Sequence, residues 1–354
     1  MEIPLKSNLV LAAALAASFP AAAPALGFVS DSAAESAAAP STAALVEALE
    51  KRLDDFYVDP AVTDSYRAAL AKALAAGEFE GLAGDALAAR FNAILQAAHP
   101  DLHLKVYAPG TGMFGKEDEA GQPDLPANAL EAAGWVAPGI AYVRPFAFFD
   151  RESDVERLQK FMDGHAEAKA LIIDLRHHVG GELREMDVIL ADLFAAPTDL
   201  LTMTTRPVAW ERFEKKAPTE RLSVIARDAT MVRELHRAVP RAGGARMAKV
   251  PVYVLTSRRT ASAAEHLALA MKVSGRATVV GDTTRGAGHY GDEIELTGGY
   301  SMFIPYGDTV DPKTGKGWEA SGVTPDIAIP AKDALDYVLE KLGAPKASSP
   351  YPVV

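Results

Sequence analysis

Residues 250–271 read VPVYVLTSRRTASAAEHLALAM, and this stretch predicts a buried strand that runs directly into a helix. Val252 to Leu255 form an unbroken apolar run, which is typical of a strand buried on both faces. From Ala264 to Met271, apolar residues recur at i, i+3, i+4 and i+7, the spacing of one buried helix face. Strands that alternate with helices in this way build an α/β fold.

Ser262 lies at the turn between this strand and this helix, and two interpretations are open. The first amides of a helix have no intrahelical partner and the helix dipole is positive there, so an oxyanion beside the hydroxyl would be stabilised. However, Ser262 and Glu265 also match the S-x-x-E capping box, which serves only to start a helix. Taken alone, the motif favours the capping interpretation.

The composition bounds the possible functions. The 354 residues are 49% hydrophobic and 23% charged, as in an ordinary globular chain. A net charge of -11 argues against nucleic-acid and membrane-surface partners, because both carry negative charge. The chain has no cysteine, which excludes disulfides, thiolate metal sites and a cysteine nucleophile.

The amino terminus predicts an export signal. Lys6 precedes the apolar run 9–17, and small residues follow it as a cleavage site. We predict a signal peptide over residues 1–27 and a flexible spacer over residues 28–40. The protein is then expected to be periplasmic or extracellular, with no stable membrane insertion after cleavage. A retained anchor helix is the alternative, but the apolar run is short for a span of ~20 residues.

Periodicity divides the rest of the chain into an N-terminal helical domain (41–99), an α/β core (100–345) and a tail (346–354). Three segments carry helical spacing, namely 45–56, 66–74 and 87–95. The β-rich runs that follow are 102–107, 140–145, 170–175, 250–256, 278–281 and 300–305. Helical stretches lie between some of them, namely 154–162, 182–193 and 262–271. We expect parallel strands covered by helices on both faces.

A second candidate feature is the segment Asp174-Leu-Arg176, which leads into Gly180-Gly181. Glycines at such a turn let backbone amides approach a substrate closely, as an oxyanion hole requires. Asp174 and Arg176 are expected to form a structural ion pair that holds the turn.

Five segments together resemble the serine peptidase family that contains the C-terminal-processing (tail-specific) proteases, the tricorn core and interphotoreceptor retinoid-binding protein. They are D-L-H (101–103), D-L-R with the paired glycines (174–181), T-A-S-A-A-E (260–265), G-D-T-T (281–284) and W-E-A-S-G-V-T-P-D (318–326). The resemblance implies a ClpP/crotonase-like core with an N-terminal helical domain. It also implies peptide-bond hydrolysis through an acyl-enzyme. Residues 108–134 are too few for an inserted PDZ domain, which favours the tricorn-like and retinoid-binding-like branch.

The resemblance implies three catalytic residues: Ser262 as nucleophile, His103 as general base and Glu319 as the carboxylate that orients the base. The processing proteases instead pair the serine with a lysine 25 residues downstream, where this chain has Ala287. Lys272 cannot replace that lysine, because it is nearly three helical turns from the serine.

The expected oxyanion-hole donors are the amides of Gly180, Gly181 and Ala263. Two departures from the tricorn-like pattern bear on the site. In the tricorn-like pattern, a serine just before the histidine links that histidine to the glutamate. This chain has Leu102 there, so Glu319 reaches His103 directly, through water, or not at all. His178 stands where the glycine turn usually has asparagine, which changes the surroundings of the oxyanion loop.

His289 follows Gly286-Ala-Gly288 and is expected to line the cleft as a substrate contact or an alternative base, ranked behind His103. No cofactor and no metal are expected. His99 and His103 are four residues apart, but Pro100 disfavours the helix that would put them on one face.

The expected partner is a peptide or protein substrate, and a homo-oligomer remains open, with the N-terminal helices as a lid or a dimer arm. Two other functions use the same scaffold. One is a non-catalytic binding protein for apolar ligands, and the other is an acyl hydrolase that acts on a non-peptide substrate.

Overall fold

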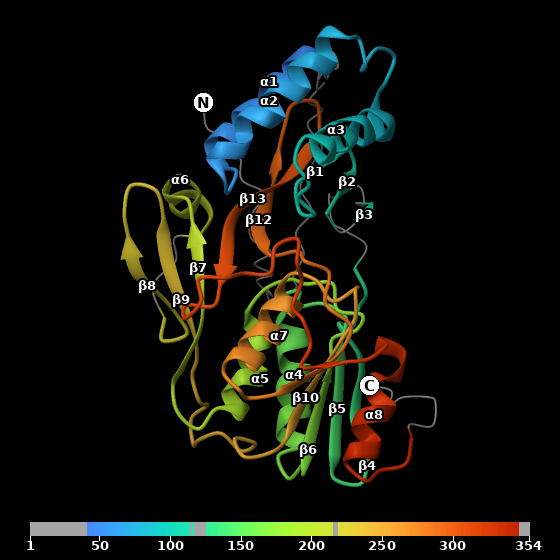
Figure 1. The fold of residues 1–354 in the computed structure, drawn as a ribbon, viewed down its shortest axis with the longest axis vertical. Coiled ribbons are helices and arrows are strands. Elements are labelled where there is room, and N and C mark those ends of the chain that lie inside the picture. Colours follow the sequence, from blue (N-terminus) through green and yellow to red (C-terminus); the bar gives the residue numbers. More distant parts are fainter. Residues whose placement is uncertain (1–40, 114, 117–124, 215–218, 347–354) are drawn as a thin grey trace, which may run out of the picture.

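The computed structural model describes residues 41–113, 115–116, 125–214 and 219–346 (Figure 1). The predicted signal peptide, the predicted spacer and all but the first residue of the predicted tail lie outside these residues. Within them, no helix is both long enough and apolar enough to cross a membrane.

Three helices come first along the chain: α1 (Thr42–Phe56), α2 (Pro60–Ala75) and α3 (Gly84–Ala98). They confirm the three helices predicted from the apolar spacing. Ser41 caps α1 by accepting a hydrogen bond from the Ala44 amide at 3.2 Å. Asp59 caps α2 by accepting from the Ala61 amide at 2.9 Å, and Pro60 at the first helical position has no amide that needs an acceptor.

The helices pack on an antiparallel sheet that was not predicted. Its order is β1 (Lys105–Tyr107), β13 (Ser301–Val310), β7 (Thr198–Thr205), β9 (Val232–Ala238) and β8 (Leu222–Arg227), and β12 (His289–Glu295) also pairs with β13. The strands β8 and β12 are mostly half-buried or exposed, so they lack the apolar runs that identify a buried strand. A separate short hairpin joins β2 (Thr111–Gly112) and β3 (Gly115–Lys116).

One hydrophobic core holds the helices to this sheet. Leu49 of α1, Tyr66 of α2 and Leu95 of α3 are fully buried in it. From the sheet, Met302 and Ile304 of β13 enter the same cluster. The N-terminal helices are therefore packed against β13, which comes more than 200 residues later in the chain.

The second sheet carries the α/β core. Its order is β14 (Ile327–Ala328), β11 (Thr278–Gly281), β10 (Val252–Thr256), β6 (Ala170–Asp174), β5 (Ile140–Pro145) and β4 (Leu130–Ala137). All neighbouring strands are parallel except β4, which pairs with β5 in the antiparallel direction. The predicted α/β core of parallel strands is thereby confirmed, and β4 is one antiparallel strand at its edge.

Helices cover both faces of this sheet, as the continuous apolar strands predict. Successive residues of β6, such as Leu171 and Ile172, belong to different hydrophobic clusters on the two faces. The helices α4 (Glu152–Gly164), α5 (Arg184–Leu193) and α7 (Ala263–Val273) contribute to one cluster, and α8 (Ala334–Lys341) contributes to the other. Short helical turns complete the described chain: α6 (Pro207–Ala209), the π-helical η1 (Trp210–Glu214) and the 3₁₀ turn η2 (Ala331–Asp333).

A buried ion pair ends β6, as predicted. The Arg176 guanidinium donates to both carboxylate oxygens of Asp174, at 2.8 and 2.6 Å. Tyr142 donates to the same carboxylate at 2.7 Å. Burial raises the pKa of Asp174, but these donors outweigh it and hold that pKa below its ordinary value. The charged pair therefore fixes the chain where it leaves the sheet toward the glycine turn.

The shared core predicts that the helical layer contributes strongly to stability. Leu49→Ala removes a fully buried side chain, so the free energy of unfolding should fall by about 2–5 kcal/mol in urea denaturation. The matched control is Leu74→Ala on α2, where the side chain is 37% exposed, and its loss should stay below about 1 kcal/mol. Equal losses in the two variants would contradict this packing.

Candidate active site

Ser262 stands at the turn between β10 and α7 in a strained backbone conformation. Its φ is 55° and its ψ is -121°, a region that non-glycine residues rarely occupy. An ordinary N-cap serine has extended backbone angles, as Ser41 does at -64° and 149°. The capping interpretation alone therefore does not account for this turn. A strained strand-to-helix turn is the arrangement that presents a nucleophilic hydroxyl above a sheet.

The buried carboxylate of Glu265 fixes this strained turn. The Ser262 amide donates to Glu265 Oε2 at 2.9 Å, which is the carboxylate half of the capping box. The Ala287 amide donates to the same oxygen at 2.9 Å. On the other oxygen, Oε1, the carboxylate accepts from the Thr284 hydroxyl and from the Gly286 amide. One carboxylate thus joins the serine turn to residues 284–287.

The paired glycines lie directly against Ser262. A Cβ added to Gly180 would lie 2.7 Å from Ser262 Cβ and 3.3 Å from its hydroxyl oxygen. At Gly181, φ is 123° and an added Cβ would lie 1.9 Å from the carbonyl oxygen of Phe148. Only glycine fits either position, because the chain packs too closely there for a side chain. The structure thus brings the predicted glycine turn to the predicted nucleophile.

His178 changes how this turn is arranged. The Gly180 amide donates to His178 Nδ1 at 3.1 Å, so it points to the imidazole in this structure. Burial lowers the pKa of His178 to about 3, which keeps the ring neutral with its proton on Nε2. That Nε2 is buried and has no hydrogen-bond partner among the described residues. The amides of Gly181 and Ala263 form no hydrogen bond within the described part of the chain.

His103 lies in a bend before β1, not on a strand as predicted. The reason is Asp101, whose Oδ1 accepts from the amides of His103 and Leu104 at 2.8 and 3.2 Å and so curls the chain into a turn. The ring packs near Phe303, with 5.7 Å between ring centroids, and its Nδ1 is buried without a partner among the described residues. Burial lowers the pKa of His103 to about 4.

His289, in contrast, has an oriented ring. Its Nδ1 lies 2.9 Å from Asp101 Oδ2, and its side chain is 16% exposed. Burial lowers the pKa of His289, but the hydrogen bond and charge of Asp101, with the charges of Glu319 and Asp308, outweigh it and raise that pKa above its ordinary value. The residue ranked second in the sequence thus has the carboxylate partner that a general base requires.

Asp101 was not identified from the sequence as a site residue. It is 1% exposed, and Tyr57, the residue at the end of α1, donates its hydroxyl to Asp101 Oδ2 at 2.9 Å. The Tyr66 hydroxyl of α2 donates to the Tyr57 oxygen at 3.1 Å. Burial raises the pKa of Asp101, but the hydrogen bond from His289 and the backbone amide of His103 outweigh it and lower that pKa. The N-terminal helices thus hold a charged carboxylate beside His289.

Glu319 lies beside His289, with its Oε2 3.9 Å from His289 Nδ1. The same oxygen accepts from the Gly288 and His289 amides at 2.6 and 2.9 Å. Two further bonds join this loop to the segment before β12, because the Ala320 amide donates to the Gly286 carbonyl and Trp318 Nε1 donates to the Ala287 carbonyl. Glu319 therefore fixes the backbone of the segment that carries His289.

The carboxylates of Asp101 and Glu319 and the His289 ring also match the donor set of a metal site, with ligand atoms within 4.8 Å of one another. These carboxylate oxygens suit a metal ion poorly, because hydrogen-bond donors already occupy them. Asp101 accepts four hydrogen bonds and Glu319 Oε2 accepts two. A metal ion would have to displace these hydrogen bonds. A histidine that takes up and releases a proton can act while all of them are kept.

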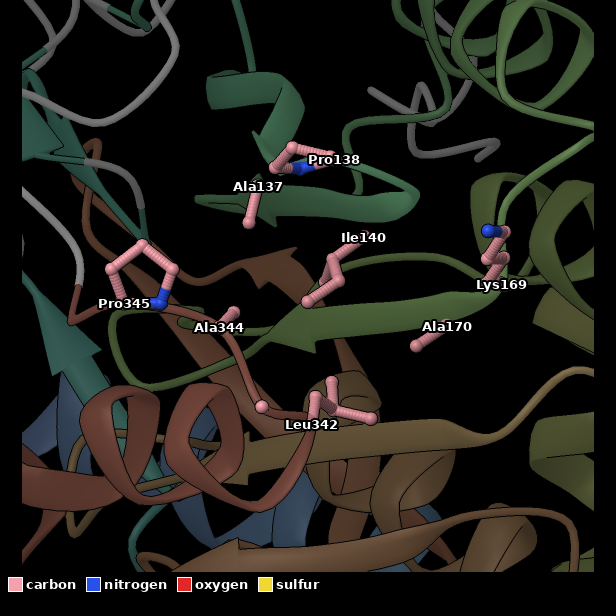
Figure 2. A pocket seen from close by; sticks show the side chains of 9 residues that line it. Ala137, Pro138, Ile140, Lys169, Ala170, Leu342, Ala344 and Pro345 are labelled. Carbon is pink, nitrogen blue, oxygen red and sulfur yellow. The ribbon is translucent and has the colours of Figure 1, made fainter.

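Two features lie away from this cluster. Lys272 Nζ donates to the Thr324 carbonyl at 2.5 Å near the far end of α7, in agreement with its exclusion as a dyad lysine. A pocket of about 330 Å³ lies between the β4–β5 turn, the start of β6 and the end of α8 (Figure 2). Ile140, Lys169 and Leu342 line it. Parallel strands begin there, so this pocket is at the opposite edge of the sheet from Ser262.

Comparison with known proteins places the fold and the family. The photosystem II D1 C-terminal processing protease is 16% identical with a TM-score of 0.52 over 86% of this chain and 98% of that one. A lipoprotein from Streptococcus agalactiae is 15% identical with a TM-score of 0.52 over 86% and 96%. The tricorn protease is 13% identical with a TM-score of 0.51 over 85% of this chain and 36% of that one.

At these identities the structural likeness shows a shared fold. The sequence model of Peptidase family S41 matches residues 139–329, which is more than half of the chain and includes Gly180, Ser262 and Glu319. The chain therefore belongs to Peptidase family S41, as the order of the five segments predicts.

Proposed function

We propose that this chain is a serine peptidase that hydrolyses peptide bonds through an acyl-enzyme on Ser262. The observation that carries the proposal is the backbone of Ser262, at φ 55° in a strand-to-helix turn beside Gly180. Strain of this kind costs of the order of 1–3 kcal/mol and persists at active sites, where the geometry that it creates is used.

In the proposed reaction, the Ser262 hydroxyl oxygen attacks the carbonyl carbon of the scissile peptide bond while an imidazole takes the hydroxyl proton. The tetrahedral intermediate collapses, the carbon–nitrogen bond breaks, and the imidazolium returns the proton to the leaving amine. Water, deprotonated by the same imidazole, then attacks the acyl carbon. The bond from that carbon to the Ser262 oxygen breaks, the carboxylic acid product leaves, and the imidazolium returns the proton to the serine oxygen. The proton balance closes in each half of the cycle.

The oxyanion is proposed to bind the amides of Ala263 and Gly181, which have no acceptor within the described residues. Ala263 is the first residue of α7, where the helix dipole adds positive potential. The Gly180 amide is bound to His178 and joins the oxyanion hole only when the turn rotates it toward the serine. Each donor of this kind is worth about 10²–10³ in turnover.

The proposed base is one of the two histidines that flank Asp101. His103 is the residue implied by the tricorn-like resemblance, with Glu319 as its orienting carboxylate. His289 contacts the same aspartate through its ring, whereas His103 contacts it through its backbone amide.

The proposed substrate is a peptide or protein segment, and the proposed location is outside the cytoplasm. The support for export is the sequence pattern of residues 1–27, whose short apolar run and small-residue cleavage site are typical of a signal peptide. Amino-terminal sequencing of the mature protein tests this location, with a new terminus expected shortly before residue 28.

Ser262→Ala should abolish peptide hydrolysis and labelling by a fluorophosphonate. The fold should persist, because the Glu265 carboxylate and the backbone carry the hydrogen bonds of the turn. Residual turnover should be below about 10⁻³ of the wild-type value. Peptide cleavage, intact-mass spectrometry of the labelled protein and circular dichroism measure these three properties.

The matched control is Ser274→Ala, at the other end of α7, which should label and cleave as the wild type does. Wild-type protein that stays unlabelled, together with a co-purified apolar ligand, would contradict the peptidase and favour the binding protein. Labelling of Ser262 with hydrolysis of acyl esters but of no peptide would favour the non-peptide acyl hydrolase.

A further inference from the structure

We propose that His289, oriented by Asp101, is the general base that activates Ser262, in place of His103. This inference rests on the proposed function, because it assigns the proton acceptor of the same Ser262 nucleophile. It also gives Asp101, a residue that contacts no reacting atom, the role of a positioning residue.

A stretch of hydrogen-bonded backbone joins the serine turn to the residue that carries this imidazole. Ser262 and Ala287 donate their amides to one oxygen of Glu265, so the segment before β12 is fixed beside the nucleophile. The next two amides, of Gly288 and His289, are bound to Glu319 Oε2. The backbone that leads from the serine turn to the imidazole is therefore held at each of three successive residues.

The carboxylate of Asp101 orients the His289 ring. His289 Nδ1 lies 2.9 Å from Asp101 Oδ2, and a charged carboxylate can only accept a hydrogen bond, so the neutral ring carries its proton on Nδ1. Nε2 is then the ring nitrogen with a free lone pair. This tautomer is the one that can take a proton from a hydroxyl.

Asp101 is itself held in place from three parts of the fold. It accepts from Tyr57 at the end of α1, from the amides of His103 and Leu104, and from His289 at the start of β12. A buried carboxylate with four donors stays charged, so it can stabilise an imidazolium as it forms.

His103 lacks these features. Its Nδ1 is buried with no partner in the described residues, so no hydrogen bond to that nitrogen fixes the tautomer of the ring. Burial lowers the pKa of His103 to about 4, which makes the ring a weak proton acceptor near neutral pH. The contact with Phe303 of β13 gives the ring a packing role.

The decisive comparison is the second-order rate of fluorophosphonate labelling at Ser262 in two single variants. His289→Ala should slow labelling by ~10²–10⁴-fold, the usual contribution of a general base. His103→Ala should slow it less than ~10-fold. His165→Ala, at the end of α4 and away from Ser262, is the matched control for loss of an imidazole.

The opposite result, with slow labelling in His103→Ala and nearly wild-type labelling in His289→Ala, would overturn the inference. The proposed function would still stand, because Ser262 of the wild-type protein is labelled. Wild-type protein that fails to label at Ser262 would instead sink the proposed function itself. If His289→Ala does not fold by circular dichroism, His289→Gln decides: it preserves shape and hydrogen bonding but takes up no proton, so it should be equally slow.

The pH profile separates the two histidines independently. A general base works only when neutral, so kcat/KM falls as the pH drops through its pKa. The groups that face His289 are Asp101, Glu319 and Asp308, with His103 and Tyr57 on Asp101, and the three carboxylates raise the pKa of His289. The acidic limb should therefore lie above pH 6.5. A limb near pH 4 would assign the base to His103.

Asp101→Asn tests the positioning role. The amide nitrogen of asparagine can donate to His289 Nδ1, which moves the ring proton to Nε2 and removes the free lone pair from the side of the serine. Turnover should fall by ~10²–10⁴-fold, and the acidic limb should shift to lower pH because a negative charge is lost. An unchanged limb would show that Asp101 serves only the fold.

Discussion

The buried carboxylate of Glu265 is the interaction on which the site depends. It accepts four hydrogen bonds, one from the strained Ser262 turn and three from residues 284–287. Burial raises the pKa of Glu265, and the same four donors oppose that rise. Without this carboxylate, the strained turn at Ser262 would lose one amide hydrogen bond, and residues 284–287 would lose three of the bonds that hold them beside the serine. The S-x-x-E motif is thus both a helix start and a link between two parts of the active site.

The N-terminal helices belong to the site as well as to the fold. They share a hydrophobic core with β12 and β13, and through Tyr57 they reach Asp101. Asp101 in turn holds His289 at the start of β12. A helical layer that would otherwise be only a cover therefore positions the imidazole relative to the sheet that carries Ser262. The proposed chemistry therefore uses Tyr57 and Asp101, which lie before the S41 match, as well as residues inside it.

Local sequence patterns predicted the parts of the fold that depend on residues close together in the chain. The apolar strand and helix around Ser262, the glycine turn, the Asp174–Arg176 ion pair and the first three helices were all confirmed, because each depends on neighbours in the chain. The antiparallel sheet was missed, since β8 and β12 expose much of their surface and carry no apolar run. The bend at His103 was missed because a single side chain, Asp101, competes there with strand pairing.

The His289–Asp101 pair could not have been found from spacing. The two residues are 188 positions apart, and neither lies in a motif that fixes the other. Asp101 was visible only as the first letter of D-L-H, where attention goes to the histidine. The physical reason for the pair is the burial of Asp101, which the sequence does not show, because a buried carboxylate requires hydrogen-bond donors.

The most direct measurement is a crystal structure of the protein with Ser262 covalently phosphonylated. The phosphonyl oxygen occupies the place of the oxyanion, and the remaining alkoxy oxygen occupies that of the leaving group. The account predicts that His289 Nε2 lies within hydrogen-bond distance of Ser262 Oγ or of the leaving-group oxygen, with Nδ1 still on Asp101. A structure in which the imidazole of His103 takes that place, with His289 turned away, would contradict it.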